Sequence, residues 1–343
     1  MEVLDLASQD IVLLAHGSGG TLSHELVEQV FVKHLANPIL SALEDASLLQ
    51  LEGEGRLAFT TDSYVVRPLF FPGGDIGRLA VCGTVNDLSM RGAVPLFLSV
   101  GFILEEGLPL ADLERIVSSL AQTAQEAGVQ VVTGDTKVVE RGNADGLFIN
   151  TAGIGLVPPG VEVGASRARP GDCVLLSGAV GDHGLAIMTQ REGLQFEGAL
   201  RSDCAPLNTL VQALLSAAPH THVLRDPTRG GLATTLNELA GQSSVGIEID
   251  EDAIPLHEAV RAASELLGLD PLYVANEGKL VAIVPPEEAE AALAAMRAHP
   301  LGSEAALIGR VVDEHPGRVI LRTILGTSRI LEMLAGEQLP RIC

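Results

Sequence analysis

The residue whose chemistry is clearest is Cys343, which closes the sequence in the segment Leu339-Pro340-Arg341-Ile342-Cys343. A cysteine beside a free α-carboxylate is poorly placed for packing and well placed to carry a chemical group on a movable segment. Pro340 lacks a backbone donor and fixes one φ angle, so the segment is not expected to end as a helix. Soluble proteins avoid unpaired surface thiols, which favours a carrier role over an incidental one. A prenylation box is excluded, because it needs the cysteine four residues from the end.

Four aspartates form a second group that could carry chemistry. Asp45 precedes a predicted strand, Asp62 and Asp135 follow predicted strands, and Asp87 lies inside a predicted helix. Carboxylates at strand ends can converge beside a sheet, where Mg²⁺ takes oxygen ligands and shares them with substrate phosphates. Asn86 could assist as an uncharged group. The alternative is a set of helix caps and turn aspartates, which is a common use of Asp; it is favoured for Asp45 alone but not for Asp87.

Two glycine-rich segments could bind phosphate. The segment His16-Gly17-Ser18-Gly19-Gly20-Thr21 precedes a helical pattern, and backbone N–H groups at a helix start suit anions. It lacks the Gly-Lys-Ser/Thr ending of a P-loop and the G-x-G-x-x-G pattern of a dinucleotide fold, so a flexible arm is an equal alternative. Residues 178–184 leave the same two alternatives open. Their His183 is expected to be structural or polar lining more than a general base.

Two further polar segments adjoin predicted elements. In Asn276-Glu277-Gly278-Lys279, Glu277 could present a carboxylate on an exposed turn, although a solvated turn without function is the simpler interpretation. In Arg225-Asp226-Pro227-Thr228-Arg229-Gly230-Gly231, Thr228 could cap the following helix. The two arginines of that segment could hold an anion.

Composition places the chain among globular cytoplasmic proteins. Its 343 residues, 47% hydrophobic and 19% charged, suffice for two domains with sizeable cores. No apolar run reaches the length of a membrane span, and the N-terminus lacks the basic start of a secretory signal. The cysteines, which are Cys82, Cys173, Cys204 and Cys343, show no zinc spacing and no disulfide framework. The first three are expected in the core.

The net charge restricts the class of ligand. A formal charge of −22 argues against binding to nucleic acid or to an anionic membrane surface. A phosphate ligand would need its repulsion offset, and a divalent metal held by carboxylates would do this. Only three lysines occur, Lys33, Lys137 and Lys279, and two of them lie inside the polar motifs.

Helices and strands are expected to alternate through both halves of the chain. The predicted helices span residues 23–35, 75–90, 112–127, 205–217, 231–240, 256–267 and 287–298. The predicted strands span residues 46–51, 56–61, 96–104, 129–133, 147–157, 172–177, 246–249, 279–284, 306–311 and 318–321. The first two form a predicted hairpin around residues 52–55. We therefore expect an α+β protein with mixed sheets covered by helices.

The predicted linker, Pro158-Pro159-Gly160, divides the chain. We predict a glycine-rich arm and helix over residues 1–40, a first domain over 41–158, a second over 159–330 and a mobile tail over 331–343. A short helical turn and a loose end are expected from residue 330 onward. Extended at roughly 3.3 Å per residue, the tail spans about 40 Å. The thiol could thus enter a nucleotide crevice and also swing out to a partner.

The motifs in this order resemble the HypE family of hydrogenase maturation proteins, within the aminoimidazole ribonucleotide synthetase-like (PurM-like) superfamily. The resemblance covers nearly the whole chain. It is carried by residues 15–20 (AHGSGG), 61–66 (TDSYVV), 85–88 (VNDL), 134–138 (GDTKV), 181–184 (GDHG), 225–232 (RDPTRGGL), 276–279 (NEGK) and 340–343 (PRIC). The cysteine tail distinguishes this family from thiamine monophosphate kinase and selenophosphate synthetase, whose other motifs are similar.

The resemblance implies a fold, an activity and partners. It implies two mixed α/β domains of the PurM-like type, a homodimer formed through the N-terminal half, and a cytoplasmic enzyme. It implies that ATP and Mg²⁺ serve an ATP-dependent carbamoyl dehydratase. The carbamoyl group on the terminal thiol would come from the carbamoyltransferase HypF. Its conversion to thiocyanate would supply the cyanide that passes to iron on the HypC–HypD complex, for the nickel–iron hydrogenase.

The resemblance also implies site residues. The magnesium ligands would be Asp45, Asp62, Asp87 and Asp135. The nucleotide-binding positions would be His16, Gly17, Gly19, Gly20, Asn86, Gly134, Thr136 and Asn276. The catalytic residues would be Cys343, Lys137 and Glu277, with Lys137 as the cation on phosphate or on the amide oxygen and Glu277 as the base for the amide protons.

Two other functions remain open at this point. The chain could be a small-molecule kinase or synthetase of the same superfamily with an idle Cys343. It could instead be a carrier or scaffold whose cysteine only binds metal or cyanide for a partner, without ATP chemistry. Loss of one water from carbamoylated Cys343 in the presence of ATP separates the dehydratase from both.

Overall fold

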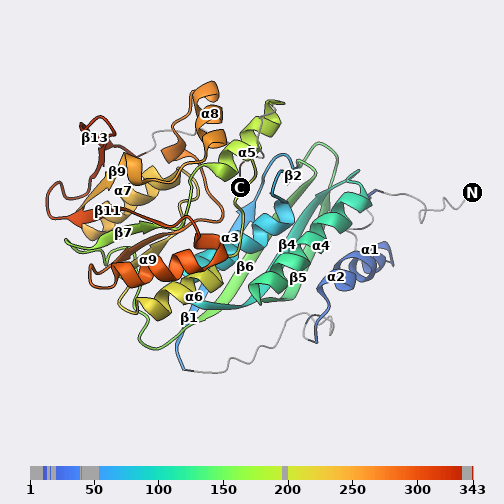
Figure 1. The fold of residues 1–343 in the computed structure, drawn as a ribbon. Coiled ribbons are helices and arrows are strands. Elements are labelled where there is room, and N and C mark those ends of the chain that lie inside the picture. Colours follow the sequence, from blue (N-terminus) through green and yellow to red (C-terminus); the bar gives the residue numbers. More distant parts are fainter. Residues whose placement is uncertain are drawn as a thin grey trace, which may run out of the picture.

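The computed structural model describes residues 11–13, 16, 21–38, 40, 54–194, 200–333 and 342. Two α/β halves lie side by side, each with its own sheet (Figure 1). This arrangement confirms the expected α+β class with mixed sheets. In the described ranges, no helix combines the length and the apolar character that a membrane crossing requires.

The first half contains a four-stranded sheet in the order β1-β6-β4-β5. Its strands are β1 (Arg56–Tyr64), β4 (Val94–Glu105), β5 (Gln130–Val139) and β6 (Leu147–Val157). The pair β4–β5 is parallel and the other pairs are antiparallel. A parallel pair needs a crossover, which the helix α4 (Leu110–Ala127) provides.

Helices cover one face of this sheet. Residues of β6 alternate between buried and partly exposed along the strand, as expected for a sheet covered on one side. The central helix α3 (Ile76–Met90) is buried on nearly every side, because it packs on the sheet and also against the second half. Asp75 caps it by accepting hydrogen bonds from the N–H groups of Gly77 and Arg78.

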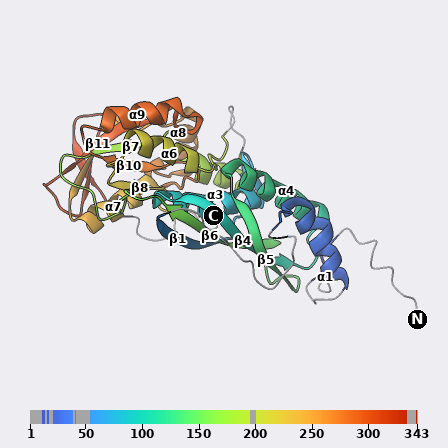
Figure 2. The ribbon, with the colours of Figure 1, turned by 90° about the horizontal axis from the view of Figure 1, so that it is seen from below.

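Smaller elements flank the same sheet. The strands β2 (Phe70–Phe71) and β3 (Gly74–Asp75) form a short hairpin ahead of α3. The segment α1 (Thr21–Leu26), η3 (Val27–Val32) and α2 (Lys33–Leu35) is one continuous helical stretch beside α4 (Figure 2). The ring centroids of Phe31 and Phe102 lie 4.9 Å apart and join this stretch to β4.

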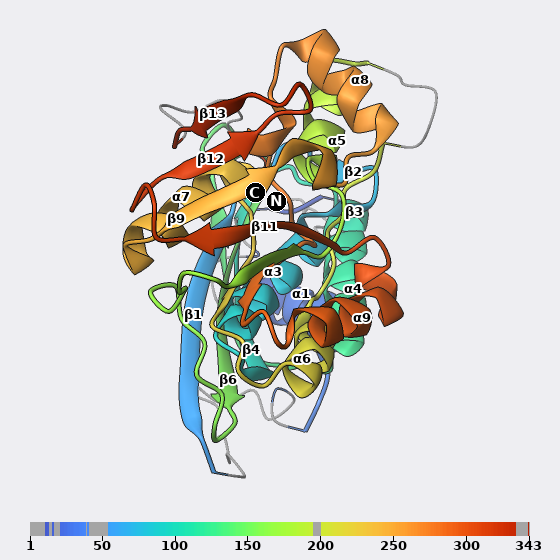
Figure 3. The same ribbon diagram turned by 60° about the vertical axis from the view of Figure 1, so that its left-hand side comes forward.

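The second half contains a seven-stranded sheet in the order β13-β12-β9-β11-β7-β10-β8 (Figure 3). The strands are β7 (Cys173–Leu176), β8 (Val223–Arg225), β9 (Gly246–Asp250), β10 (Val281–Val284), β11 (Ala306–Val312), β12 (Val319–Arg322) and β13 (Ser328–Leu331). Only the pair β9–β12 is parallel among these described strands.

Both faces of this second sheet are covered. The helices are α5 (Asp182–Arg191), α6 (Asn208–Ala217), α7 (Gly231–Ser243), α8 (Glu258–Leu267) and α9 (Ala289–Ala298), with single turns η5 (Glu251–Ala253), η6 (Pro271–Tyr273) and η7 (Pro300–Gly302). Helices α6 and α9 lie on one side and α7 on the other (Figure 2). In β7, Val174 packs with the α7 side and Leu175 with the α6 side.

Several predicted boundaries are wrong in a way that matters for the site. Strands β1 and β5 run further than predicted, so Asp62 and Asp135 lie inside strands and not after them. Strand β13 replaces the helical turn expected near residue 330 because it pairs with β12. The predicted strand over residues 46–51 lies outside the described residues.

Candidate functional site

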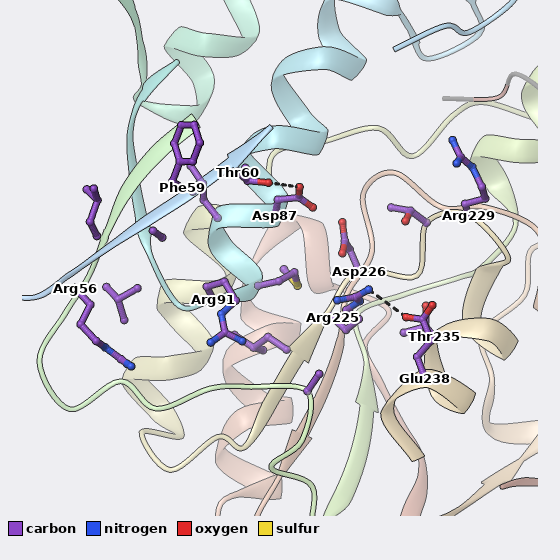
Figure 4. Close-up of a pocket in the computed structure, with 18 residues that line it drawn as sticks. Arg56, Phe59, Thr60, Asp87, Arg91, Arg225, Asp226, Arg229, Thr235 and Glu238 are labelled. Atoms are coloured by element: carbon purple, nitrogen blue, oxygen red, sulfur yellow. Dashed lines mark hydrogen bonds and ion pairs between the residues drawn. The ribbon is translucent and has the colours of Figure 1, made fainter. Parts of the chain in front are cut away.

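A cavity of about 780 Å³ lies where the two halves meet (Figure 4). Thr60 and Asp87 line it from the first half, and Arg225, Asp226 and Arg229 line it from the second. Strand β1 and helix α3 position the first pair. The end of β8 positions Arg225, and the turn between β8 and α7 positions Asp226 and Arg229. The cavity therefore combines carboxylates with arginines, a set of side chains that suits a phosphate-bearing ligand.

Asp87 lies on α3 and faces β1. Its Oδ2 accepts a 2.9 Å hydrogen bond from Oγ1 of Thr60. Burial raises the pKa of Asp87, the Thr60 hydrogen bond opposes this, and the nearby charge of Asp62 adds to the rise. Asp62 is two residues beyond Thr60 on the same strand, so both side chains point toward the same face. The structure thus brings Asp62 and Asp87 together, as expected.

Asp226 adds a third carboxylate from the second half. Burial, followed by repulsion from Asp87, raises the pKa of Asp226 to about 7. Arg225 partly offsets this repulsion and also forms an ion pair with Glu238, with Nη2 and Oε2 3.1 Å apart. The mutual repulsion of these carboxylates means that a bound cation would stabilise the site.

Glu277 lies in the same electrostatic environment. It is only 4% exposed, so its expected position on an exposed turn is wrong. Burial raises the pKa of Glu277 well above its usual range, and Cys204 and Asp226 contribute further. Its Oε1 has no hydrogen-bond partner among the described residues. A buried carboxyl oxygen without a partner is one that a substrate proton could occupy.

The buried phenol of Tyr64 independently shows this convergence. Burial raises the pKa of Tyr64 well above its usual range, and the charges of Asp62, Glu277 and Asp87 each raise it further. Tyr64 lies at the end of β1, and its hydroxyl is 3.4 Å from Oγ1 of Thr84 on α3. Three of the predicted acidic site residues, Asp62, Asp87 and Glu277, therefore lie near Tyr64 at the junction.

Two predicted nucleotide-binding residues are buried, and one of them, Asn86, joins the two halves. Asn86 donates from Nδ2 to the carbonyls of Ala205 and Glu277, and its Oδ1 accepts from the N–H of Leu207. Asn276 is likewise fully buried, with contacts to main-chain groups of the second half. In this structure both amides orient neighbouring backbone segments.

A second group of predicted residues surrounds a separate cavity of about 320 Å³ at β5. His16, Gly134, Asp135, Thr136 and Lys137 line it. Nζ of Lys137 lies 2.8 Å from Oδ1 of Asp135, and this hydrogen bond lowers the pKa of Asp135. Both side chains are about two-thirds exposed, at 65% and 69%. Burial lowers the pKa of His16, whose Nδ1 accepts from the N–H of Leu13.

The strand register separates the two groups. Asp62 is level with Thr151, Val100 and Gly134 across the sheet, so three strand spacings divide it from the Asp135 region. At about 4.8 Å per spacing this is roughly 14 Å. Within one chain, Asp135 and Lys137 therefore do not join the carboxylates at the junction.

The two groups also face opposite sides of the sheet. Thr151, level with Asp62, is buried and contacts Thr84 of α3. Asp135 is level with Asn150 and Ser63 across the strands. Asn150 donates to Oγ of Ser63 on the face that the helices leave open. Lys137 shares the side of Asp135, because strand residues two apart point the same way.

The remaining predicted site residues lie outside the described ranges, namely Asp45, Gly17, Gly19, Gly20 and Cys343. The neighbour of Cys343 is described: Ile342 is 3% exposed and belongs to an apolar cluster that both halves share.

Comparison with known proteins decides the family. The model for the AIR synthase related protein, N-terminal domain, matches residues 43–157, and that for the C-terminal domain matches residues 169–322. The chain is 57% identical to carbamoyl dehydratase HypE of Azotobacter vinelandii over 343 residues, 100% of both chains. It belongs to the HypE family.

Solved structures agree with this assignment. A HypE in complex with ATP is 56% identical, with a TM-score of 0.93 over 96% of this chain and 99% of that chain. A chain of a HypE–HypF complex is 52% identical, with a TM-score of 0.79 over 90% of this chain and 99% of that chain. The HypE resemblance of the sequence motifs and the two-domain PurM-like fold are thereby confirmed.

Two acidic residues of this HypE-family chain were missed by sequence reasoning. Asp226 lies in a segment noted only for its arginines and its capping threonine, although its position between Arg225 and Pro227 marked a constrained turn. Asp203 carried no signal, because its role depends on contact with a segment 74 residues away. Among the described residues, no three His, Cys, Asp or Glu side chains are arranged to hold a metal by themselves. Phosphate oxygens or water would have to complete any such site.

Proposed function

We propose that this chain uses ATP to dehydrate an S-carbamoyl group on its own Cys343 to S-cyanate, which supplies the cyanide ligand for the iron of nickel–iron hydrogenase. The observation that supports this most is the junction, where Asp62, Asp87, Asp226 and Glu277 surround one point beside an arginine-lined cavity. Ile342, next to Cys343, is buried in a cluster shared by both halves. Relatives named carbamoyl dehydratase match the whole chain.

The reaction must remove an oxygen atom, and oxide or hydroxide is a poor leaving group at neutral pH. Converting R–S–C(=O)NH₂ to R–S–C≡N removes one oxygen and two amide protons. Transfer of the γ-phosphoryl group of ATP to the carbamoyl oxygen forms an O–P bond and releases ADP. The C–O bond then breaks with phosphate as the leaving group, and the nitrogen loses both protons. Phosphoryl transfer depends mainly on positioning and charge neutralisation, which this junction can supply.

Glu277 is the proposed base. Burial raises its pKa, so its carboxylate takes up a proton more readily than an exposed one does. Its partnerless Oε1 is available to accept an amide proton. The surrounding carboxylates then favour the protonated state of Glu277 because they repel its charge.

Magnesium is a proposed cofactor held by Asp62 and Asp87, with Asp226 as an additional ligand or a second-sphere partner. The donor set is all oxygen, as Mg²⁺ prefers, and the repulsion that raises the pKa of Asp87 and Asp226 is relieved by a cation. Bound Mg²⁺ would neutralise charge on the transferring phosphoryl group. Asp45 remains a predicted ligand outside the described residues.

We propose a homodimer formed through the open face of the N-terminal sheet. On this face Leu57, Phe59 and Ile103 are 56%, 68% and 42% exposed, which is a high exposure for large apolar side chains on one sheet. Closing two such sheets about a twofold axis into a barrel would bury these side chains and remove the strand edges. The interface would be isologous, with the same surface used by both subunits.

The proposed dimer would bring the residues of the β5 cavity, including Asp135 and Lys137, close to the junction of the other subunit. With the twofold axis along the barrel, the β5 edge of one sheet meets the β1 edge of the other. The β5 strand of the partner subunit would then lie beside β1, so that Asp135 of the partner subunit and Lys137 of the partner subunit would be about one strand spacing from the strand that carries Asp62, where three spacings separate them within one chain. Gly134, Thr136 and His16 would contribute from the same edge.

The partners, the cellular location and the domain boundaries are also proposed. A solved HypE–HypF complex supports HypF as the donor of the carbamoyl group. The HypC–HypD complex is proposed as the acceptor of cyanide, and a cytoplasmic location stays an expectation. The division into residues 1–40, 41–158, 159–330 and 331–343 is kept as proposed.

Mass spectrometry of the C-terminal peptide tests the function directly. Chain carbamoylated on Cys343 is incubated with ATP and MgCl₂, and the peptide is expected to lose one water. The Cys343→Ser variant, treated identically, should show no such loss. ATP turnover that proceeds without any dependence on carbamoylation would favour a kinase, and absence of turnover would favour a carrier.

A further inference from the structure

The imidazole of His183 contacts the end of the chain. His183 is the second residue of α5, it is fully buried, and its ring packs edge-on against Phe71 with centroids 5.6 Å apart. Its Nε2 lies 2.6 Å from the carbonyl oxygen of Ile342. That carbonyl belongs to the peptide unit that joins Ile342 to Cys343. A tertiary contact 159 residues apart in sequence therefore fixes the last peptide group before the carrier thiol.

The contacts determine which nitrogen of His183 carries the proton. A carbonyl oxygen can only accept, so Nε2 must be the donor toward Ile342. Nδ1 lies 2.8 Å from Oγ of Ser202, and in the neutral ring it accepts the hydroxyl proton. Burial lowers the pKa of His183, which favours this neutral form. Ser202 Oγ in turn accepts from the N–H of Cys204, so its proton and one of its lone pairs are used.

The residues that hold His183 also hold Glu277. Ser202 is fixed by its N–H, which donates to the carbonyl of Pro72 at 2.8 Å. The next residue, Asp203, accepts the N–H of Glu277 at 3.0 Å. A Cβ at Gly278 would lie 1.8 Å from the carbonyl oxygen of Asp203, so the two segments are in direct contact there. Residues 202–204, which we name the strap, thus join the tail contact to the proposed base.

We propose that His183 is a positioning residue: its Nε2–H holds the carbonyl group of Ile342 next to Cys343, and the strap joins this contact to the segment that carries Glu277. This inference rests on the proposed function and names the group that presents the substrate. The packing of the Ile342 side chain in the apolar cluster adds to the restraint that the His183 hydrogen bond places on the end of the chain. One neutral hydrogen bond changes an equilibrium by about two- to tenfold, so the tail can be held for reaction and still released to a partner.

The alkylation rate of the Cys343 thiol tests this His183 contact without requiring the dehydration reaction. The background is Cys173→Ser, because Cys173 is partly exposed whereas Cys82 and Cys204 are buried. Replacing His183→Phe keeps a ring but removes the donor. We expect alkylation of Cys343 to accelerate by about two- to tenfold. His183→Gln, whose amide can donate to the same carbonyl, should restore part of the protection.

The matched control is His220→Phe, at a side chain that is 79% exposed and far along the chain from the tail. It should alkylate at the wild-type rate. The dehydration rate should fall in His183→Phe with the KM for ATP unchanged, and it should recover in His183→Gln. Equal alkylation rates for His183→Phe and the unmutated background would overturn the proposal.

Nitrogen-15 NMR of the unmutated imidazole covers the case in which His183→Phe does not fold. The spectrum should show the Nε2–H tautomer, and deletion of residues 342–343 should shift its resonance. An unshifted resonance, or the Nδ1–H tautomer, refutes the proposal that His183 restrains the end of the chain. If alkylation responds but no dehydration occurs in any variant, the restraint by His183 stands and the proposed function fails. If dehydration occurs and alkylation does not respond, only the restraint by His183 fails.

Discussion

The N–H of Glu277 donates a 3.0 Å hydrogen bond to Oδ1 of Asp203, and both side chains are almost completely buried. Asp203 is also paired with Lys279, whose Nζ lies 3.4 Å from Oδ2. Its charge therefore has a partner, while Oε1 of Glu277 has none among the described residues. Two neighbouring carboxylates thus differ in role: Asp203 fixes the backbone, and Glu277 is left able to exchange a proton.

Replacing Glu277→Gln should abolish dehydration while ATP still binds. The amide keeps the shape of the side chain but cannot take a proton, and loss of a general base lowers rates by about 10²–10⁴-fold. Water loss from the carbamoylated C-terminal peptide is the measurement, with ATP affinity by calorimetry beside it. Glu287→Gln, at an exposed position, is the matched control. Dehydration at the wild-type rate in Glu277→Gln would remove the base assignment.

Mixed dimers test whether two subunits build one site. Asp62→Asn and Lys137→Met should each be inactive as homodimers. In a shared site, a dimer with one chain of each kind contains one intact site and one doubly altered site. Random reassortment makes half of the dimers mixed, so about a quarter of wild-type activity should return. If the mixture stays as inactive as its components, Asp62 and Lys137 do not act across subunits.

The open face of the N-terminal sheet should determine the oligomeric state. Phe59→Asp places a charge where the proposed interface is apolar, and burying an unpaired charge is costly. We expect a shift from dimer to monomer by light scattering at micromolar concentration. Leu325→Asp, at an 85% exposed side chain in the turn between β12 and β13, is the control and should stay dimeric. A dimeric Phe59→Asp variant would locate the interface elsewhere.

Asp226 should make stability depend on pH. Its pKa is about 7 in the folded chain and about 3.9 when unfolded. The folded state therefore binds the proton more tightly, and stability falls as pH rises from about 4 through 7. Asp226→Asn removes this loss, so its Tm should exceed that of the wild type above pH 7 and match it near pH 4.

The gain in Tm of Asp226→Asn should depend on Mg²⁺ as well as on pH. A gain of 1 kcal/mol corresponds to about 2–4 °C in a domain of this size. MgCl₂ should reduce the difference by raising the wild-type Tm, because the cation offsets the same repulsion. Asp252→Asn, at an exposed carboxylate, should show no pH-dependent gain. A Tm difference that is constant from pH 4 to pH 8 would contradict the shifted pKa.

Local pattern predicted most elements of the fold. Helix α4 was expected over residues 112–127 and spans Leu110–Ala127, because its apolar residues recur at helical spacing and Gly128 ends it in a left-handed conformation. Strand ends were predicted poorly in β1 and β5, since the polar residues Asp62 and Asp135 interrupt an apolar pattern. Pairing with β6 and β4 continues both strands past those residues.

The sequence by itself determined the family and its carbamoyl dehydratase chemistry, because these depend on residue types in a fixed order. Only the tertiary structure decided how the predicted site residues are grouped. It placed Asp62, Asp87 and Glu277 at one junction, added Asp226, and set Asp135 and Lys137 on the other side of a sheet. It also revealed that His183 holds the last peptide unit. The reason is physical: burial, charge repulsion and strand register act between segments far apart in the chain, and local sequence carries no record of those distances.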